Sequence, residues 1–294
     1  MTENNIQVVK PKRFTLAKIL RIFFITFGLV FLYAPILSLI IYSFNASKMM
    51  TVWGGWSIKW YFALFADKQM MDAVLTSLIV SFCAASMSVI IGTLAAIVLA
   101  RISKFKGETL FALFITAPMV LPEVIVGLSM LLLFVTLSDL IGWPQRGMVT
   151  IWIAMVTVTA AYVTVVVRSR LMELDYSIEE ASQDLGAGPV KTFFAITLPS
   201  ILPAIISGWL LAFTLAMDDL VITTFVSGPS SSTLPMVVFS SVRRGLNPEI
   251  NALATIIVFI VSLCTFCYWL VRVRKEKRMR QDMKMAMLAQ ATRK

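Results

Sequence analysis

Six long apolar runs alternate with shorter polar segments along the chain. They lie at about 19–44, 73–100, 110–137, 148–167, 200–226 and 250–271. A helix needs about 20 apolar residues to cross the hydrocarbon core of a bilayer, and each run is about that long or longer. Lipid offers the backbone no hydrogen-bonding partners, so the runs are expected to be helical. The pattern predicts an all-α membrane protein with six transmembrane helices within one domain, residues 19–271.

The longest polar interruption is residues 168–199, between the fourth and fifth runs. Ser177-Ile-Glu-Glu180 has the spacing of a capping box, with Ser177 at the N-cap and Glu180 at N3. Gly186 supplies a helix stop, and Pro189 suits the first position of a second short helix. This segment is therefore predicted to be a helical hairpin that leads into the fifth run.

The first helix of that hairpin is predicted to be amphipathic. A narrow apolar face follows the spacing i, i+3, i+4 and i+7, with Ile178, Ala181, Ser182 and Leu185. Acidic and amide side chains fall on the opposite face, with Glu179, Glu180, Gln183 and Asp184. The small residues at 181 and 182 would let a partner approach closely, although packing against lipid or the protein's own helices explains the same pattern.

The basic residues predict the orientation of the helices. The chain has 59% hydrophobic and only 14% charged residues, a formal net charge of +10 and a mean hydropathy of +0.85. With the N-terminus in the cytoplasm, 20 of the 26 Lys and Arg residues lie on the cytoplasmic side. This asymmetry follows the positive-inside rule and argues against nucleic-acid binding. It places the N-terminal segment 1–18, the hairpin and the basic tail 272–294 in the cytoplasm.

Motifs for catalysis within this chain are missing from the sequence. It contains no His and no Gly-Lys dipeptide, so the phosphate-binding P-loop is excluded. Three cysteines lie in apolar runs, where packed and inert thiols are expected. Because the sequence has no His, we do not expect these cysteines to form a metal site. We expect a non-catalytic protein without a metal or cofactor of its own.

Three carboxylates interrupt the apolar runs: Glu123, Asp218 and Asp219. A mid-membrane carboxylate costs about 2.5–3.5 kcal/mol on insertion scales. At about 1.5 Å per residue, Glu123 lies ~20 Å and the aspartates ~27 Å from the cytoplasmic ends of their helices. Such acids indicate a wet pathway or a bound cation. Alternatively, one aspartate caps a helix break or pairs with a base of a partner subunit.

The hairpin carries a motif that resembles a known family. Glu180-Ala181-Ser182, Gly186 and Ile196-Thr197-Leu198-Pro199 resemble the EAA loop of bacterial ABC-importer permeases, with Ser182 where the family prefers Ala. Ser43–Ser47, the Asp218-Asp219 pair and residues 226–255 resemble the polyamine branch, which takes up putrescine or spermidine. The resemblance covers almost the whole chain.

The resemblance implies a type I importer fold in the bacterial inner membrane. It implies a heterodimer with a sister permease, two cytoplasmic ATPase subunits that use ATP and Mg²⁺, and a periplasmic polyamine-binding protein. The hairpin would then dock on an ATPase through the matching residues: Ser177, Glu180, Ala181, Ser182, Gly186, Ile196, Leu198 and Pro199.

A polyamine is a flexible cation that carboxylates and aromatic faces would hold. The expected substrate pathway contains Glu123, Asp218, Asp219, Tyr162, Trp209 and Phe213. For the aromatic residues, packing against lipid or the core is the competing explanation. Two other functions stay open: a proton- or sodium-coupled carrier that uses the three acids, and a non-transporting membrane anchor. The capped hairpin argues against the carrier, which needs no ATPase dock.

Overall fold

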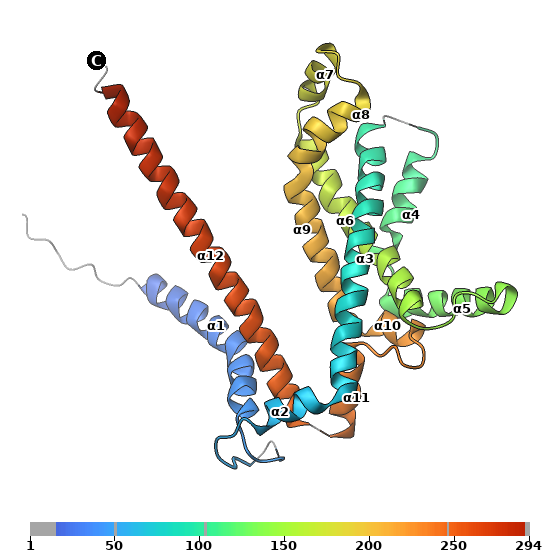
Figure 1. Ribbon diagram of the computed structural model, residues 1–294, viewed down its shortest axis with the longest axis vertical. Coiled ribbons are helices and arrows are strands. Elements are labelled where there is room, and N and C mark those ends of the chain that lie inside the picture. The colour runs from blue at the N-terminus through green and yellow to red at the C-terminus, as the bar shows by residue number, and fades with distance from the viewer. Residues whose placement is uncertain (1–15, 50–51, 103–104, 246, 292–294) are drawn as a thin grey trace, which may run out of the picture. The chain divides into compact units, whose positions relative to one another are not determined.

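The computed structural model describes residues 16–49, 52–102, 105–245 and 247–291. Apart from one isolated bridge between Asn45 and Trp56, the regular structure of these residues is helical (Figure 1). The helices are α1 (Leu16–Ser43), α2 (Lys59–Ala66), α3 (Lys68–Arg101), α4 (Glu108–Val120), α5 (Glu123–Ile141), α6 (Met148–Glu173), α7 (Ser177–Asp184), α8 (Pro189–Thr192), the π-helical segment η1 (Phe193–Thr197), α9 (Leu198–Asp218), α10 (Val221–Val226), α11 (Leu234–Arg244) and α12 (Pro248–Ala291). Most of the predicted N-terminal segment, residues 1–15, lies outside the described residues.

Within the described part of the chain, six helices are long and apolar enough to cross a membrane. They are Leu20–Ser43, Lys68–Arg101, Glu123–Ile141, Met148–Glu173, Pro189–Asp218 and Pro248–Met279. This confirms the predicted all-α architecture with six spans. The last helix continues to Ala291, so the segment expected as a separate tail extends the sixth span without interruption up to that residue.

Two of the predicted spans are broken in the structure. The third run divides into α4 and α5, because Leu121 leaves the helical conformation at ψ 140° and Pro122 follows it. A residue before proline disfavours the helical region, which accounts for the break there. The fifth run divides after Asp218, and the short α10 begins at Val221. The third and fifth runs therefore each contain a helix break, and the break at Asp219 is the one that the capping alternative left open.

The described helices fall into two compact units. The first contains α1, α2 and α12, and α12 packs against both of the others. The buried side chain of Asn45 stabilises the loop between α1 and α2 by hydrogen bonds. Its Nδ2 donates to the Val52 carbonyl at 2.8 Å, and its Oδ1 accepts from the N–H groups of Ser47 and Gly54.

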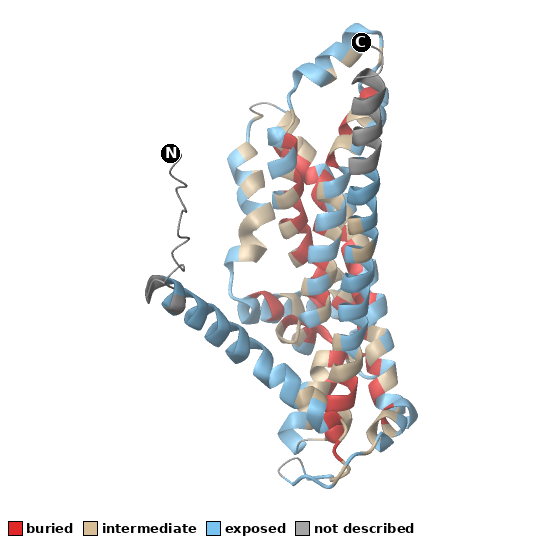
Figure 2. Ribbon diagram, turned by 90° about the vertical axis from the view of Figure 1, so that its left-hand side faces the viewer, coloured by how far each residue is buried: buried red, intermediate tan, exposed pale blue. Residues whose placement is uncertain are grey.

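The second unit is built on three helices, α3, α6 and α9, which pack against one another (Figure 1). Their facing surfaces hold most of the buried residues, while their outer surfaces are apolar and exposed (Figure 2). The buried contacts use small side chains, and Ser88 and Thr159 share a hydrogen bond of 2.7 Å between α3 and α6. The three cysteines, expected to be packed, are exposed on α3 and α12, because they lie on the outer apolar surfaces of these helices.

Gly92 sets the closest approach of α3 to α6 and supplies a first prediction. A Cβ atom at this position would lie 2.8 Å from Val163 Cβ and 2.9 Å from the Ala160 carbonyl oxygen. Backbone cannot move aside cheaply, so Gly92→Ala is expected to destabilise the protein by about 1–3 kcal/mol. The measurement is the thermal denaturation midpoint of the purified protein in detergent.

Gly208 on α9 provides the matched control, because it faces the same valine. Its Cβ would lie 3.4 Å from Val163 Cγ1, an ordinary contact. Gly208→Ala should therefore leave the midpoint close to that of the wild type. Equal midpoints for the two variants would contradict the proposed role of Gly92 at the α3–α6 contact.

Candidate functional site

The predicted hairpin is present and consists of α7, α8 and η1, at one end of the α3–α6–α9 bundle (Figure 1). Gly186 follows the first helix with φ +86°, a left-handed conformation that favours glycine. Pro189 stands at the start of α8. These two features of the hairpin agree with the sequence.

The capping box predicted for Ser177 and Glu180 is wrong. Ser177 lies within the first turn of α7, and Tyr176 occupies the N-cap position without a side-chain cap. Asp175 takes over the capping role, because its Oδ1 accepts a hydrogen bond from the Ser177 N–H at 3.0 Å. Hydrogen bonds from the backbone and the hydroxyl of Ser177 lower the pKa of Asp175 below its usual value. The charged carboxylate is the stronger acceptor, which explains why it displaces the serine hydroxyl.

The two glutamates of the first hairpin helix point in different directions, contrary to the predicted common polar face. The Glu179 carboxylate turns toward the bundle and is 13% exposed, whereas Glu180 is exposed. The predicted apolar face is also exposed, since Ile178 is 53% and Leu185 is 89% accessible. Val190 on α8 belongs to the same set of exposed apolar residues. The hairpin thus exposes apolar side chains together with the carboxylates of Glu180 and Asp184.

The other residues of the motif lie within the hairpin or at its base. Ala181 is exposed, and the half-buried Ser182 hydroxyl is 3.2 Å from that of Thr192, which joins α7 to α8. Ile196 and Leu198 lie where η1 meets α9, and Leu198 packs against the buried core of the bundle. Pro199 stands in the first turn of α9. Ile196, Leu198 and Pro199 therefore connect the hairpin to the fifth span.

The three membrane carboxylates lie at the two helix breaks. Glu123 is the first residue of α5, and Asp218 is the last residue of α9. Helices α5 and α10 pack closely, since a Cβ on Gly127 would lie 3.3 Å from the Ile222 Cα. Glu123 lies one turn before Gly127 on α5, and Asp219 immediately precedes α10, the helix that packs against α5. The structure therefore gathers these acids, which the sequence could place only at similar depth.

The adjacent aspartates have different environments. Asp219 caps α10: its Oδ2 accepts from the Thr223 N–H at 2.7 Å, and its Oδ1 accepts from the Ile222 N–H at 3.4 Å. This is the capping role that the sequence left open. The Asp218 side chain is exposed and has no hydrogen bond or ion pair to another described residue. Of the two aspartates, Asp218 is thus the one whose carboxylate is not engaged by another described residue.

Helix α10 is held at its other end by residues that the sequence did not single out. Arg146 Nη2 donates to the Phe225 carbonyl at 2.9 Å, and Thr150 Oγ1 donates to the Val226 carbonyl at 2.7 Å. Both residues flank the start of α6. These bonds satisfy carbonyls that a helix end otherwise leaves free, so the break in the fifth span is a fixed feature.

Two of the predicted aromatic residues, Trp209 and Phe213, lie on α9 but point away from Asp218 around that helix. Trp209 and Phe213 stack with their centroids 5.3 Å apart, and the Trp209 indole donates to Ser86 Oγ on α3 at 3.1 Å. At about 100° per residue, Asp218 falls roughly opposite Trp209 around α9. Tyr162 is half-buried on α6 and makes no ring contact with this pair in the described structure. The α9 pair contributes mainly to the packing of α9 on α3, together with Phe82.

Known proteins of similar sequence belong to one class of membrane transport components. Residues 88–281 match the family described as binding-protein-dependent transport system inner membrane component. The chain is 60% identical over 267 residues to the putrescine transport system permease protein PotI of Escherichia coli K12, covering 90% of this chain and 95% of that protein. It is 39% identical to the spermidine/putrescine transport system permease protein PotC of Haemophilus influenzae, covering 78% and 87%.

A solved bacterial ABC transporter involved in the import of alginate has a similar fold. The TM-score is 0.66 at 15% identity, with 89% of this chain and 99% of that chain covered. These relatives are transport permeases, not enzymes, and they give no support to an ion-coupled carrier. The chain therefore belongs to the binding-protein-dependent inner membrane components, the multi-pass permeases of ABC importers, among relatives of the polyamine branch.

Proposed function

We propose that this chain is a permease subunit that imports polyamines, with putrescine as the preferred substrate, into the cytoplasm. The observation that carries the proposal is the exposed Asp218 carboxylate beside a helix break, with Glu123 at a second break. Broken helices at membrane depth are typical of substrate sites in transporters. The 60% identity to a putrescine permease supports the choice of substrate.

The chemistry of the breaks suits a cation. Helices α4 and α9 both end at these breaks, and the last carbonyl groups of a helix have no partner within the helix, so they can accept from a cation. Asp218 adds a full negative charge at the end of α9. Glu123 adds a second charge in the first turn of α5, and Asp219 contributes by keeping α10 in place. A diamine that passes this point would exchange its water for these oxygen atoms in turn.

Transport requires partners that this chain would contact from both sides of the membrane. We propose that a sister permease completes the pathway, that two cytoplasmic ATPase subunits supply ATP hydrolysis, and that a periplasmic binding protein delivers the substrate. The exposed hairpin residues Ile178, Glu180 and Leu185 would fit a groove on an ATPase, as an amphipathic helix commonly does. This arrangement requires the hairpin and both termini to face the cytoplasm.

The test is reconstitution of the chain in proteoliposomes with these partners. Uptake of labelled putrescine should require both ATP inside the vesicles and the binding protein outside. Spermidine, measured in competition, should be taken up less efficiently. Uptake that follows an ion gradient in the absence of ATP would overturn the proposal.

A further inference from the structure

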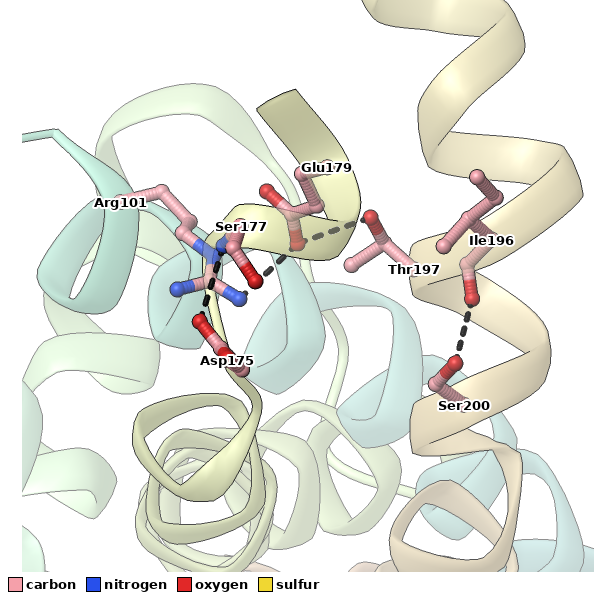
Figure 3. A network of polar contacts seen from close by, with 7 residues as sticks. All are labelled: Arg101, Asp175, Ser177, Glu179, Ile196, Thr197 and Ser200. Atoms are coloured by element: carbon pink, nitrogen blue, oxygen red, sulfur yellow. Dashed lines mark hydrogen bonds and ion pairs between the residues drawn. The ribbon is translucent and has the colours of Figure 1, made fainter. Parts of the chain in front are cut away.

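The Glu179 carboxylate joins three segments that meet at the base of the hairpin. Its Oε1 lies 2.9 Å from Arg101 Nη2, at the last residue of α3. The same oxygen accepts a hydrogen bond from Thr197 Oγ1 at 3.0 Å, at the end of η1 (Figure 3). One carboxylate oxygen thus connects the first hairpin helix to both α3 and the entry to α9.

The surroundings of this ion pair favour a persistent contact. The side chains of Arg101 and Glu179 are only 17% and 13% exposed, and Thr197 is buried. The Arg101 guanidinium also lies over the Tyr176 ring, 5.3 Å from its centroid. Water screens a half-buried pair of this kind much less than a surface pair.

The ion pair adds a connection that the chain itself does not make. The hairpin is covalently joined to α6 and α9, whereas Arg101 is 78 positions before Glu179 in the sequence. Helices α3, α6 and α9 form the packed bundle of this unit. Arg101 thus connects the hairpin to α3, the one helix of the bundle to which the hairpin is not directly joined along the chain.

The segment that Glu179 contacts through Thr197 is an irregular helix, η1. Residues Phe193–Thr197 form a π-helical turn, in which the Leu198 N–H bonds to the Phe193 carbonyl. Such turns are rare and frequently occur at functional sites. Thr197 ends this turn and donates to Glu179, so the contact lies at the point where the hairpin becomes the fifth span.

We infer that Arg101, Glu179 and Thr197 form a coupling clamp, which transmits displacement of the hairpin to the membrane helices. Arg101 and Glu179 are positioning residues in this scheme and contact neither substrate nor nucleotide. Their neighbour Glu180 is exposed on the surface of the hairpin, whereas Glu179 connects the hairpin to the bundle through its ion pair with Arg101. The inference rests on the proposed function, because it assumes a partner that displaces the hairpin.

The test measures putrescine uptake per ATP hydrolysed by the reconstituted complex. Glu179→Gln and Arg101→Gln should leave subunit assembly and basal ATP hydrolysis near the wild-type level. Loss of a coupling contact should lower uptake per ATP by about fivefold or more. The reversed pair Arg101→Glu with Glu179→Arg should recover about half of the lost uptake, since the two sites interact directly.

Arg170 supplies the matched control. It pairs with Glu173 at 3.0 Å within the last turn of α6, but these side chains are 44% and 66% exposed and belong to one helix. Arg170→Gln removes the same charge near the hairpin without cutting a link between segments, so uptake per ATP should not change.

The outcomes separate this inference from the proposed function. If the wild-type complex takes up no putrescine with ATP, the proposed function fails first. If the wild type transports but Glu179→Gln and Arg101→Gln keep its uptake per ATP, the clamp is overturned. Should these variants fail to assemble, Thr197→Val decides: it keeps both charges, and an unchanged uptake per ATP would overturn the clamp.

Discussion

Replacement of Glu180 by lysine is expected to abolish putrescine uptake while the permease still inserts into the membrane. Glu180 is exposed on the hairpin and makes no ion pair with a described residue, so the substitution leaves the internal contacts of the hairpin intact. In the proposed docking, Glu180 faces a basic side chain of the ATPase. Lysine would then create a like-charge contact, which costs several kcal/mol and corresponds to a loss of docking of about a hundredfold or more. The measurements are uptake in proteoliposomes and co-purification of the ATPase with the permease.

Glu173→Lys is the control for this change. Glu173 ends α6 near the hairpin, is 66% exposed and pairs only with Arg170 among the described residues. The same reversal of charge at this position should leave co-purification and uptake near the wild-type level. Normal uptake by Glu180→Lys, or equal loss by both variants, would show that the exposed face of the hairpin is not the docking surface.

The hairpin shows how far local sequence signals reach. Gly186 and Pro189 act within a few residues, and both have the predicted roles. The orientation of Glu179 depends on Arg101, which the sequence places far away. Helical periodicity assigned Glu179 to the same polar face as Glu180, because periodicity cannot include a distant partner. The capping error is local, since Asp175 and Ser177 compete for the same helix start.

The two helix breaks also differ in how far the sequence reveals them. Pro122 marks the first break in the sequence, although hydropathy alone reads through it. The second break has no proline or glycine near Asp219. Arg146 and Thr150, which flank the start of α6, bind the far end of the short helix that follows this break. Acidic residues in an apolar run indicated a functional site, but the different roles of Asp218 and Asp219 follow from the hydrogen bonds of Asp219 to the start of α10 in the structure.

That difference gives the second large effect. Asp218→Asn is expected to lower putrescine uptake by about ten- to a hundredfold, since a hydrogen bond to a charged group contributes about 1.5–3 kcal/mol. Asp218 is exposed and makes no bond to another described residue, so thermal stability of the permease should not fall. The measurements are the initial rate of uptake at several putrescine concentrations and the thermal denaturation midpoint in detergent.

Substitutions of the neighbouring residue separate recognition of a cation from capping. Asparagine caps a helix about as well as aspartate, so Asp219→Asn should keep α10 in place and leave uptake within about threefold of the wild type. Asp219→Ala removes the acceptor for the Thr223 N–H and should cost about 0.5–2 kcal/mol of stability. Its denaturation midpoint should therefore fall, unlike that of Asp218→Asn.

If Asp219→Asn lowered uptake as much as Asp218→Asn while stability held, both carboxylates would contact the cation. If Asp218→Asn transported normally, Asp218 would not bind the cation, and the cation-binding site would be formed by Glu123 or lie elsewhere in the pathway.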